Sequence, residues 1–95
     1  MNAGNNRAQR HDQHIAQTIL ALCLKCGPDK TICPSEAARF ITSNDDDWRE
    51  LLDDIRSVGA ALVQQGQIEF TQLGTVVDPA DAKGAIRFRM RSGDQ

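Results

Sequence analysis

The stretch Lys30-Thr31-Ile32-Cys33-Pro34-Ser35-Glu36-Ala37-Ala38-Arg39 predicts a short strand that passes directly into a helix. Pro34 suits the first turn of that helix, because the N–H groups of a first turn have no partner within the helix and proline has no N–H to lose. Glu36 follows Cys33 at capping-box spacing, so its carboxylate is expected to accept a hydrogen bond from the Cys33 N–H. The inward face of this short helix is predicted to consist of Ala37, Phe40 and Ile41.

Longer helical patterns lie on both sides of this stretch. From Asp12 onward, apolar residues recur at steps of three and four until Gly27-Pro28 supplies a cap and a residue that cannot continue the helix. A second apolar stripe covers residues 48–65 and stops before a glycine. Asp47 and Glu50 at its start have capping-box spacing. The sequence therefore predicts three helices.

Two segments alternate apolar and polar residues with the period of a strand. The first contains Ile68 and Phe70, and the second contains Ile86, Phe88 and Met90. The connection over residues 73–85 is too long for a tight hairpin turn and is expected to form one loop. A helix, a short strand, two further helices and a strand pair with a long loop are the elements of a winged helix. The sequence thus predicts an α+β winged-helix fold, with three helices and a small antiparallel sheet.

The same patterns predict a single hydrophobic core that draws on all three helices and both strands. Its expected members are Ile15, Ile19, Leu22, Phe40, Ile41, Trp48, Leu51, Leu52, Ile55, Leu62, Ile68, Phe70, Ile86 and Phe88. Trp48, the only tryptophan, is interpreted as a core anchor in preference to a stacking platform for bases.

The chain has 95 residues, of which 40% are hydrophobic and 25% are charged, and its formal net charge is −2. This composition is typical of a soluble globular domain and gives no overall attraction to nucleic acid or to an anionic membrane. No segment approaches the roughly 20 apolar residues of a membrane span, so we expect no membrane partner and a cytoplasmic location. We predict a disordered leader over residues 1–11, a winged-helix domain over residues 12–91 and a disordered tail over residues 92–95.

Several motifs resemble those of a family of small bacterial winged-helix proteins of unassigned function. They are Lys30–Glu36, Asp47-Trp48-Arg49, Leu62-Val63, Gly66-Gln67-Ile68-Glu69, Thr71-Gln72, Gly74, Val77-Asp78-Pro79 and Gly84-Ala85-Ile86-Arg87. The resemblance covers roughly residues 15–90 and implies a fold but no activity. The chain departs from the family pattern at Leu73, where a basic residue often precedes the wing glycine, and at Ala85, where proline is common. The first departure weakens the case for a wing tip that contacts phosphates.

Charge is distributed unevenly along the chain. The predicted third helix begins among six carboxylates with one base, Arg49, and these carboxylates are Asp45, Asp46, Asp47, Glu50, Asp53 and Asp54. The C-terminal segment is basic, and alternation along its strand places three arginines on one face. The candidate residues for contact with nucleic acid are Arg49, Arg56, Lys83, Arg87, Arg89 and Arg91.

Two classes of function remain open. The leading interpretation is a nucleic-acid-binding winged-helix regulator, in which the third helix and the arginine strand contact DNA or RNA. The alternative is a protein–protein interaction module, self-association included, that uses the acidic helix and the basic strand as contact surfaces. A third and plainer interpretation makes the arginines a solvated strand face, partly paired with Glu69 on the neighbouring strand. Acidic charge on the third helix favours the protein-interaction alternative.

Enzymatic and metal chemistry find little support in the sequence. Cys23 and Cys26 have the spacing of a zinc or redox pair, which Cys33 with His11 or His14 would complete. Both cysteines lie on the apolar stripe, however, so core packing is the favoured interpretation, and Cys33 is interpreted as a cap in preference to a reactive thiol. We therefore expect no bound metal, no cofactor and no enzymatic activity.

Overall fold

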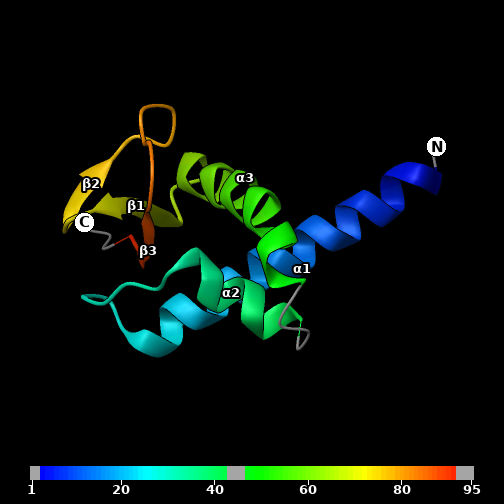
Figure 1. The fold of residues 1–95 in the computed structure, drawn as a ribbon, viewed down its shortest axis with the longest axis horizontal. Coiled ribbons are helices and arrows are strands. Elements are labelled where there is room, and N and C mark those ends of the chain that lie inside the picture. The colour runs from blue at the N-terminus through cyan, green and yellow to red at the C-terminus, as the bar shows by residue number, and fades with distance from the viewer. Residues whose placement is uncertain (1–2, 43–46, 92–95) are drawn as a thin grey trace.

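The computed structural model describes the backbone of residues 3–42 and 47–91, and the side chains of residues 11–42 and 47–91 (Figure 1). The elements in chain order are α1 (Ala3–Cys26), α2 (Pro34–Ile41), the 3-10 helix η1 (Trp48–Leu51), α3 (Leu52–Gln64), β1 (Ile68–Gln72), β2 (Thr75–Val77) and β3 (Arg87–Met90). The predicted α+β architecture of three helices with a small antiparallel sheet is confirmed, and it is consistent with the winged-helix layout.

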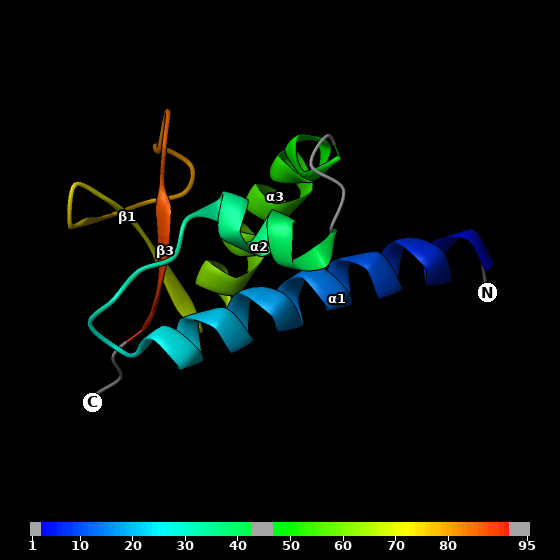
Figure 2. The same cartoon turned by 60° about the horizontal axis from the view of Figure 1, so that its bottom comes forward.

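The helices pack together on one side of the molecule, and the sheet lies against their ends (Figure 2). The sheet is antiparallel and has the strand order β2-β1-β3. Ile32, in the connection from α1 to α2, exchanges two backbone hydrogen bonds with Phe88 of β3, at 2.9 and 2.8 Å. The short strand predicted before α2 is therefore present as a single bridge at the edge of the sheet.

The core lies between the three helices and the inner face of the sheet. Its buried hydrophobic side chains are Ile15, Ile19, Cys23, Ile32, Ala37, Ala38, Ile55, Val58, Leu62, Ile68, Phe70, Ile86 and Phe88. The Phe70 and Phe88 rings lie side by side across β1 and β3, with their centroids 5.4 Å apart. Gly59 of α3 faces both rings, so the absence of a side chain lets this helix approach the sheet closely.

The structure corrects the inward face predicted for α2. Phe40 is 69% exposed, and the buried residues of this helix are Ala37 and Ala38. Two alanines let α2 approach α1 and α3 more closely than a phenylalanine would. The helix is therefore rotated about its axis so that Ala37 and Ala38 face the core and Phe40 faces outward. Five other residues of the predicted core are half-buried and pack against its edge: Leu22, Ile41, Trp48, Leu51 and Leu52.

Two helix starts also differ from the prediction. α1 begins at Ala3, well before Asp12, so residues 3–11 continue the helix where a disordered leader was expected. Polar residues with good helix propensity, such as arginine and glutamine, extend a helix without an apolar stripe, and the periodicity misses them. Asp47 makes no side-chain capping hydrogen bond and leads into a 3-10 turn, so the capping box expected there is absent. The predicted tail, residues 92–95, lies outside the described residues.

The cap of α2 is confirmed. The Cys33 N–H donates to Glu36 Oε1 at 2.9 Å, and Pro34 occupies the first turn. Gly27 ends α1 with a φ of 102° and donates its N–H to the Cys23 carbonyl oxygen, as the glycine cap predicts.

The long connection predicted over residues 73–85 is wrong in one respect. Leu73 and Gly74, with φ values of 52° and 82°, form a tight turn that joins β1 to an unpredicted strand, β2. A non-glycine residue rarely adopts a positive φ, so Leu73 gave no turn signal in the sequence. The longer loop follows β2 and leads to β3.

In the part of the chain that the structure describes, no helix is long and apolar enough to cross a membrane.

Candidate binding surfaces

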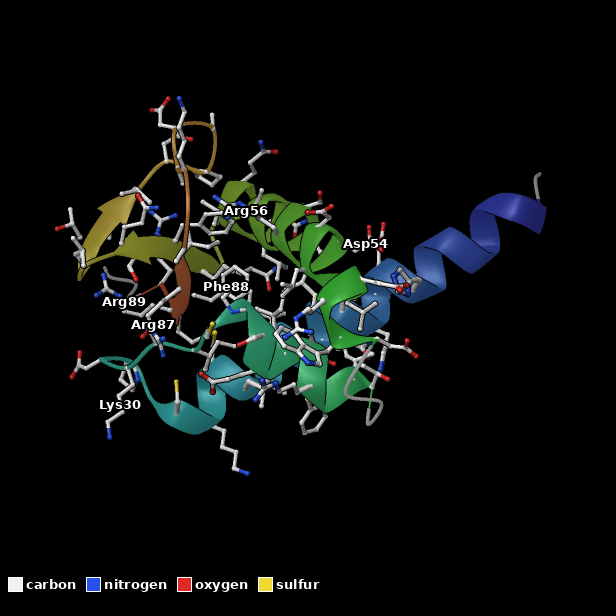
Figure 3. All side chains as sticks on the ribbon, in the orientation of Figure 1. Lys30, Asp54, Arg56, Arg87, Phe88 and Arg89 are labelled. Atoms are coloured by element: carbon white, nitrogen blue, oxygen red, sulfur yellow. The ribbon has the colours of Figure 1, made fainter. Side chains whose placement is uncertain are left out.

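The arginines of β3 lie on the sheet face away from the core. Phe88 is fully buried, whereas Arg87 is exposed and Arg89 is half-buried (Figure 3). Arg89 lies opposite Glu69 in the β1–β3 ladder and donates two hydrogen bonds to Glu69 Oε1, at 2.7 and 3.2 Å. Because the two side chains are only 28% and 22% exposed, the pair is partly shielded from solvent. The positive charge of Arg89 is therefore balanced within the sheet.

Arg87 is also held by groups of the same chain. Its Nε donates to Thr31 Oγ1 at 2.5 Å, and its Nη2 donates to the Thr31 carbonyl oxygen at 3.3 Å. The same Nη2 lies 3.6 Å from Glu36 Oε1, the oxygen that caps α2. Arg87 thus ties β3 to the start of α2, and a carboxylate lies beside its guanidinium group.

Arg56 fastens the loop between β2 and β3 to α3. Its Nη1 and Nη2 donate to the carbonyl oxygens of Gly84 and Ala82, at 2.8 and 2.9 Å. Gln72 supports the same loop by donating to the carbonyl oxygens of Lys83 and Ala85. Arg56 was predicted to contact nucleic acid, but its guanidinium donors are directed toward the loop (Figure 3). Its contacts give it a structural role.

Lys83 and Arg91 are the remaining candidates near the sheet. Both side chains are exposed, and within the described residues neither forms an ion pair. Lys83 lies on the loop before β3, whereas Arg91 follows the end of β3 and donates its backbone N–H to the Gln67 carbonyl oxygen. These two cations flank the sheet without forming a continuous basic stripe.

The start of α3 is acidic, as the sequence predicts. Asp53 and Asp54 are both exposed, and Asp54 Oδ2 lies 3.0 Å from His11 Nε2 on α1. Both partners of this contact are exposed, so the pair adds little to stability. The first turn of α3 therefore carries two exposed carboxylates, and one of them, Asp54, is directed toward α1.

A different cationic cluster forms where α2 packs against η1. The Cζ atoms of Arg39 and Arg49 lie 4.7 and 4.9 Å from the centroid of the Trp48 ring. Neither guanidinium group donates a hydrogen bond or forms an ion pair within residues 11–42 and 47–91. Phe40 follows Arg39 in the sequence of α2, and its side chain is exposed. We call these four residues, Arg39, Phe40, Trp48 and Arg49, the Arg–Trp surface.

Sequence reasoning identified Arg49 but missed Arg39 and Phe40 as surface residues. A periodicity argument had assigned Phe40 to the core, and Arg39 was separated from Arg49 by an acidic segment. The sequence feature that pointed to this surface was the position of Arg39 and Phe40 in the last turn of a short helix.

The cysteines behave as packing residues. Cys23 is fully buried, and burial raises the pKa of its thiol from 9.0 to about 12, with smaller contributions from Cys26 and Glu36. Half-buried Cys26 directs its thiol to the Cys23 carbonyl oxygen, at 3.3 Å. The predicted core position of Cys23 is confirmed. Among the described side chains, no group of three or more His, Cys, Asp or Glu residues is placed to hold a metal ion.

A family model described as a protein of unknown function, DUF3253, matches residues 12–91. The chain belongs to this family. The match begins within α1 and extends through β3, so it includes the helical core, the sheet and both ends of the β2–β3 loop. No curated protein matches the chain. Membership in the DUF3253 family assigns no activity, and the function must be argued from the surfaces of the domain.

In this DUF3253 domain the six predicted contact residues do not form one site. Arg49 belongs to the Arg–Trp surface, Arg56 lies on α3, and Lys83 lies on the loop between β2 and β3. Arg87, Arg89 and Arg91 lie on or beside β3. Two of the six, Arg87 and Arg89, have in-chain carboxylate partners. These two lie on the same face of β3, opposite Thr71 and Glu69 of β1.

Proposed function

We propose that this DUF3253 domain is a non-enzymatic module that binds a protein partner. The observation that carries the proposal is the pairing of the strand arginines, Arg89 with Glu69 and Arg87 with Glu36. A phosphate group that approached either arginine would meet the neighbouring carboxylate as well. The arginines of β3 were the main reason to prefer a nucleic-acid partner over a protein partner. Two of them, Arg87 and Arg89, lie beside carboxylates of the same chain, which balance their positive charge.

The acidic start of α3 supports the same proposal. Two unit charges of like sign that are 4 Å apart repel by about 1 kcal/mol in bulk water and by about 4 kcal/mol where water is partly excluded. Exposed Asp53 and Asp54 would face such repulsion if α3 entered the major groove of DNA. A protein partner can instead place basic or neutral groups opposite these carboxylates.

The non-enzymatic part of the proposal rests on the side-chain geometry. A nucleophilic site needs a serine or cysteine beside a general base that a third group orients. In the described part of the chain, no histidine is hydrogen-bonded to a serine or cysteine, and His11 contacts only Asp54. The Ser35 hydroxyl instead donates to Cys33 Sγ at 3.1 Å, at the start of α2.

Two binding measurements on the purified protein test this function. Fluorescence anisotropy with random duplex DNA, single-stranded DNA and RNA, at about 50 mM salt, is expected to show no saturable binding, although phosphate contacts are strongest at low salt. Selection from a displayed library of degenerate peptides is expected to yield sequences that bind the folded protein saturably.

Nucleic-acid binding that weakens with rising salt, combined with the recovery of no peptide, would overturn the proposal. In that case each Arg→Ala change at Arg87 or Arg89 should reduce the log–log salt slope by about 0.9. The Arg91→Ala variant provides the comparison, because it removes an exposed arginine that forms no ion pair within the described residues and so measures how much of the slope comes from an unpaired cation.

A further inference from the structure

We infer that the Arg–Trp surface is the contact site and that it binds an acidic peptide segment carrying an apolar side chain. This inference rests on the proposed function, because it names the chemistry of the protein partner. Four features carry it: two guanidinium groups that form no ion pair among the described residues, the indole that positions them, an exposed phenylalanine, and the contrast with Arg56, Arg87 and Arg89.

The two guanidinium groups are positioned by the Trp48 ring, and their N–H donors make no hydrogen bond to the residues that the structure describes. Arg39 and Arg49 contact the ring of Trp48, and such cation–π contacts hold an arginine without consuming its N–H donors. Each guanidinium carries five N–H donors arranged to bind a carboxylate through two hydrogen bonds. The indole therefore limits the conformations of two carboxylate-binding groups before any partner arrives, which reduces the entropy lost on binding.

Arg56, Arg87 and Arg89 differ from the two arginines of the Arg–Trp surface in how their donors are used. Those three arginines donate to carbonyl, hydroxyl or carboxylate oxygens of the same chain. Arg39 and Arg49, in comparison, bring two like charges to one indole, and no ion pair joins either of them to a carboxylate among the described residues. A carboxylate supplied by a partner would reduce this repulsion and accept hydrogen bonds from the guanidinium groups.

Phe40 indicates that the partner also supplies an apolar group. Its side chain is 69% exposed on α2, a helix that packs against η1. Tryptophan and arginine are enriched among residues that dominate binding energy, and aromatic residues are enriched at the centres of protein interfaces. Burial of Phe40 against a partner's apolar side chain would remove this ring from water.

An acidic peptide fits this surface better than a nucleic acid does. Asp47 and Glu50 are exposed on either side of the Trp48-Arg49 pair in the sequence. The closely spaced charges of a phosphate backbone would approach these carboxylates, whereas a peptide can place one or two carboxylates at the guanidinium groups and neutral residues elsewhere.

A peptide selection with paired variants tests the inference. The degenerate displayed library is selected on the wild-type protein and, separately, on the Arg39→Ala/Arg49→Ala double variant. Peptides recovered only with the wild type are expected to contain Asp or Glu next to a leucine or an aromatic residue. A synthetic peptide from this set should bind about tenfold more weakly to each single Arg→Ala variant, and Arg→Lys should recover only part of the affinity.

Matched controls separate the site from the rest of the surface. Leu24 on α1 is 67% exposed, so Leu24→Ala removes an equally exposed apolar side chain and should leave affinity unchanged, whereas Phe40→Ala should weaken binding. Arg91→Ala removes an exposed positive charge and should likewise have no effect. Because all of these side chains are exposed, thermal unfolding of each variant should resemble that of the wild type.

Three outcomes would overturn the inference. Selected peptides without enrichment in Asp or Glu would contradict the proposed acidic partner. Equal binding of the peptides by the wild type and the Arg39→Ala/Arg49→Ala variant would place the binding site elsewhere on the protein. In both cases the protein-binding function would stand. Recovery of no peptide together with salt-dependent binding of nucleic acid would contradict both the inference and the proposed function.

Discussion

Replacement of Gly59 by alanine is expected to destabilise the domain, even though alanine is the better helix former. A Cβ atom at this position would lie 2.7 and 2.9 Å from Phe88 Cε1 and Cζ, and 3.2 Å from Phe70 Cε1. Both rings are fully buried, so neither can swing into solvent to make room. Overpacking of a core costs about 1–3 kcal/mol. Since two rings are affected, we place the cost at about 2–3 kcal/mol within that range.

The helix propensity of alanine offsets part of this cost, by about 1 kcal/mol. The net loss of unfolding free energy is therefore expected to be about 1–2 kcal/mol, which lowers Tm by about 4–16 °C in a domain of this size. Urea unfolding followed by circular dichroism measures the change.

Ser57→Ala, at an exposed position in the same helix, is the control for alanine propensity and should change stability by no more than about 0.5 kcal/mol. Adding Phe88→Leu to Gly59→Ala should cost less than the sum of the two single changes, because the shorter side chain relieves the clash. A Gly59→Ala variant as stable as the wild type, or more stable, would refute the close approach of α3 to the sheet.

Three further changes test other parts of the structure. Ile55→Ala removes a fully buried side chain and should lower the unfolding free energy by about 2–5 kcal/mol in urea titrations. Arg56→Ala should cost about 1 kcal/mol and speed amide hydrogen exchange over residues 82–85, because two carbonyl oxygens lose their donor; unchanged exchange would contradict its anchoring role. Cys23 should resist alkylation in the folded protein. Its thiol has a pKa raised from 9.0 to about 12 in the fold, so the unfolded chain ionises first and stability should fall as pH rises above 9. A Cys23→Ser variant, compared by urea unfolding across this range, should show a shallower fall.

Local sequence patterns predicted most of the fold. The cap formed by Cys33 and Glu36 depends on residues three positions apart, and proline at the first helical turn depends on one residue, so both were readable from the chain. The apolar periods likewise predicted three helices and two of the three strands. β2 was missed because it has only three residues and follows a turn in which Leu73 adopts a positive φ.

Features that depend on tertiary packing were less predictable. The outward position of Phe40 follows from how α2 rotates to bury Ala37 and Ala38, and periodicity alone does not fix that rotation. Arg56 reaches the loop after β2, and Arg87 reaches Glu36, so the partners of these arginines come from distant parts of the chain. The sequence predicted the Arg89–Glu69 pair because neighbouring strands place those residues opposite each other.

DNA binding by a Glu36→Gln/Glu69→Gln variant tests most directly whether in-chain carboxylates neutralise the strand arginines. Glutamine retains the capping-box hydrogen bond of α2, so the change removes charge while preserving the cap. With random duplex DNA at about 50 mM salt, the wild type is expected to show no binding. The variant should gain weak binding with a log–log salt slope of about −1.8, equivalent to two freed phosphate contacts. Salt-dependent binding by the wild type, unchanged in the variant, would contradict the account.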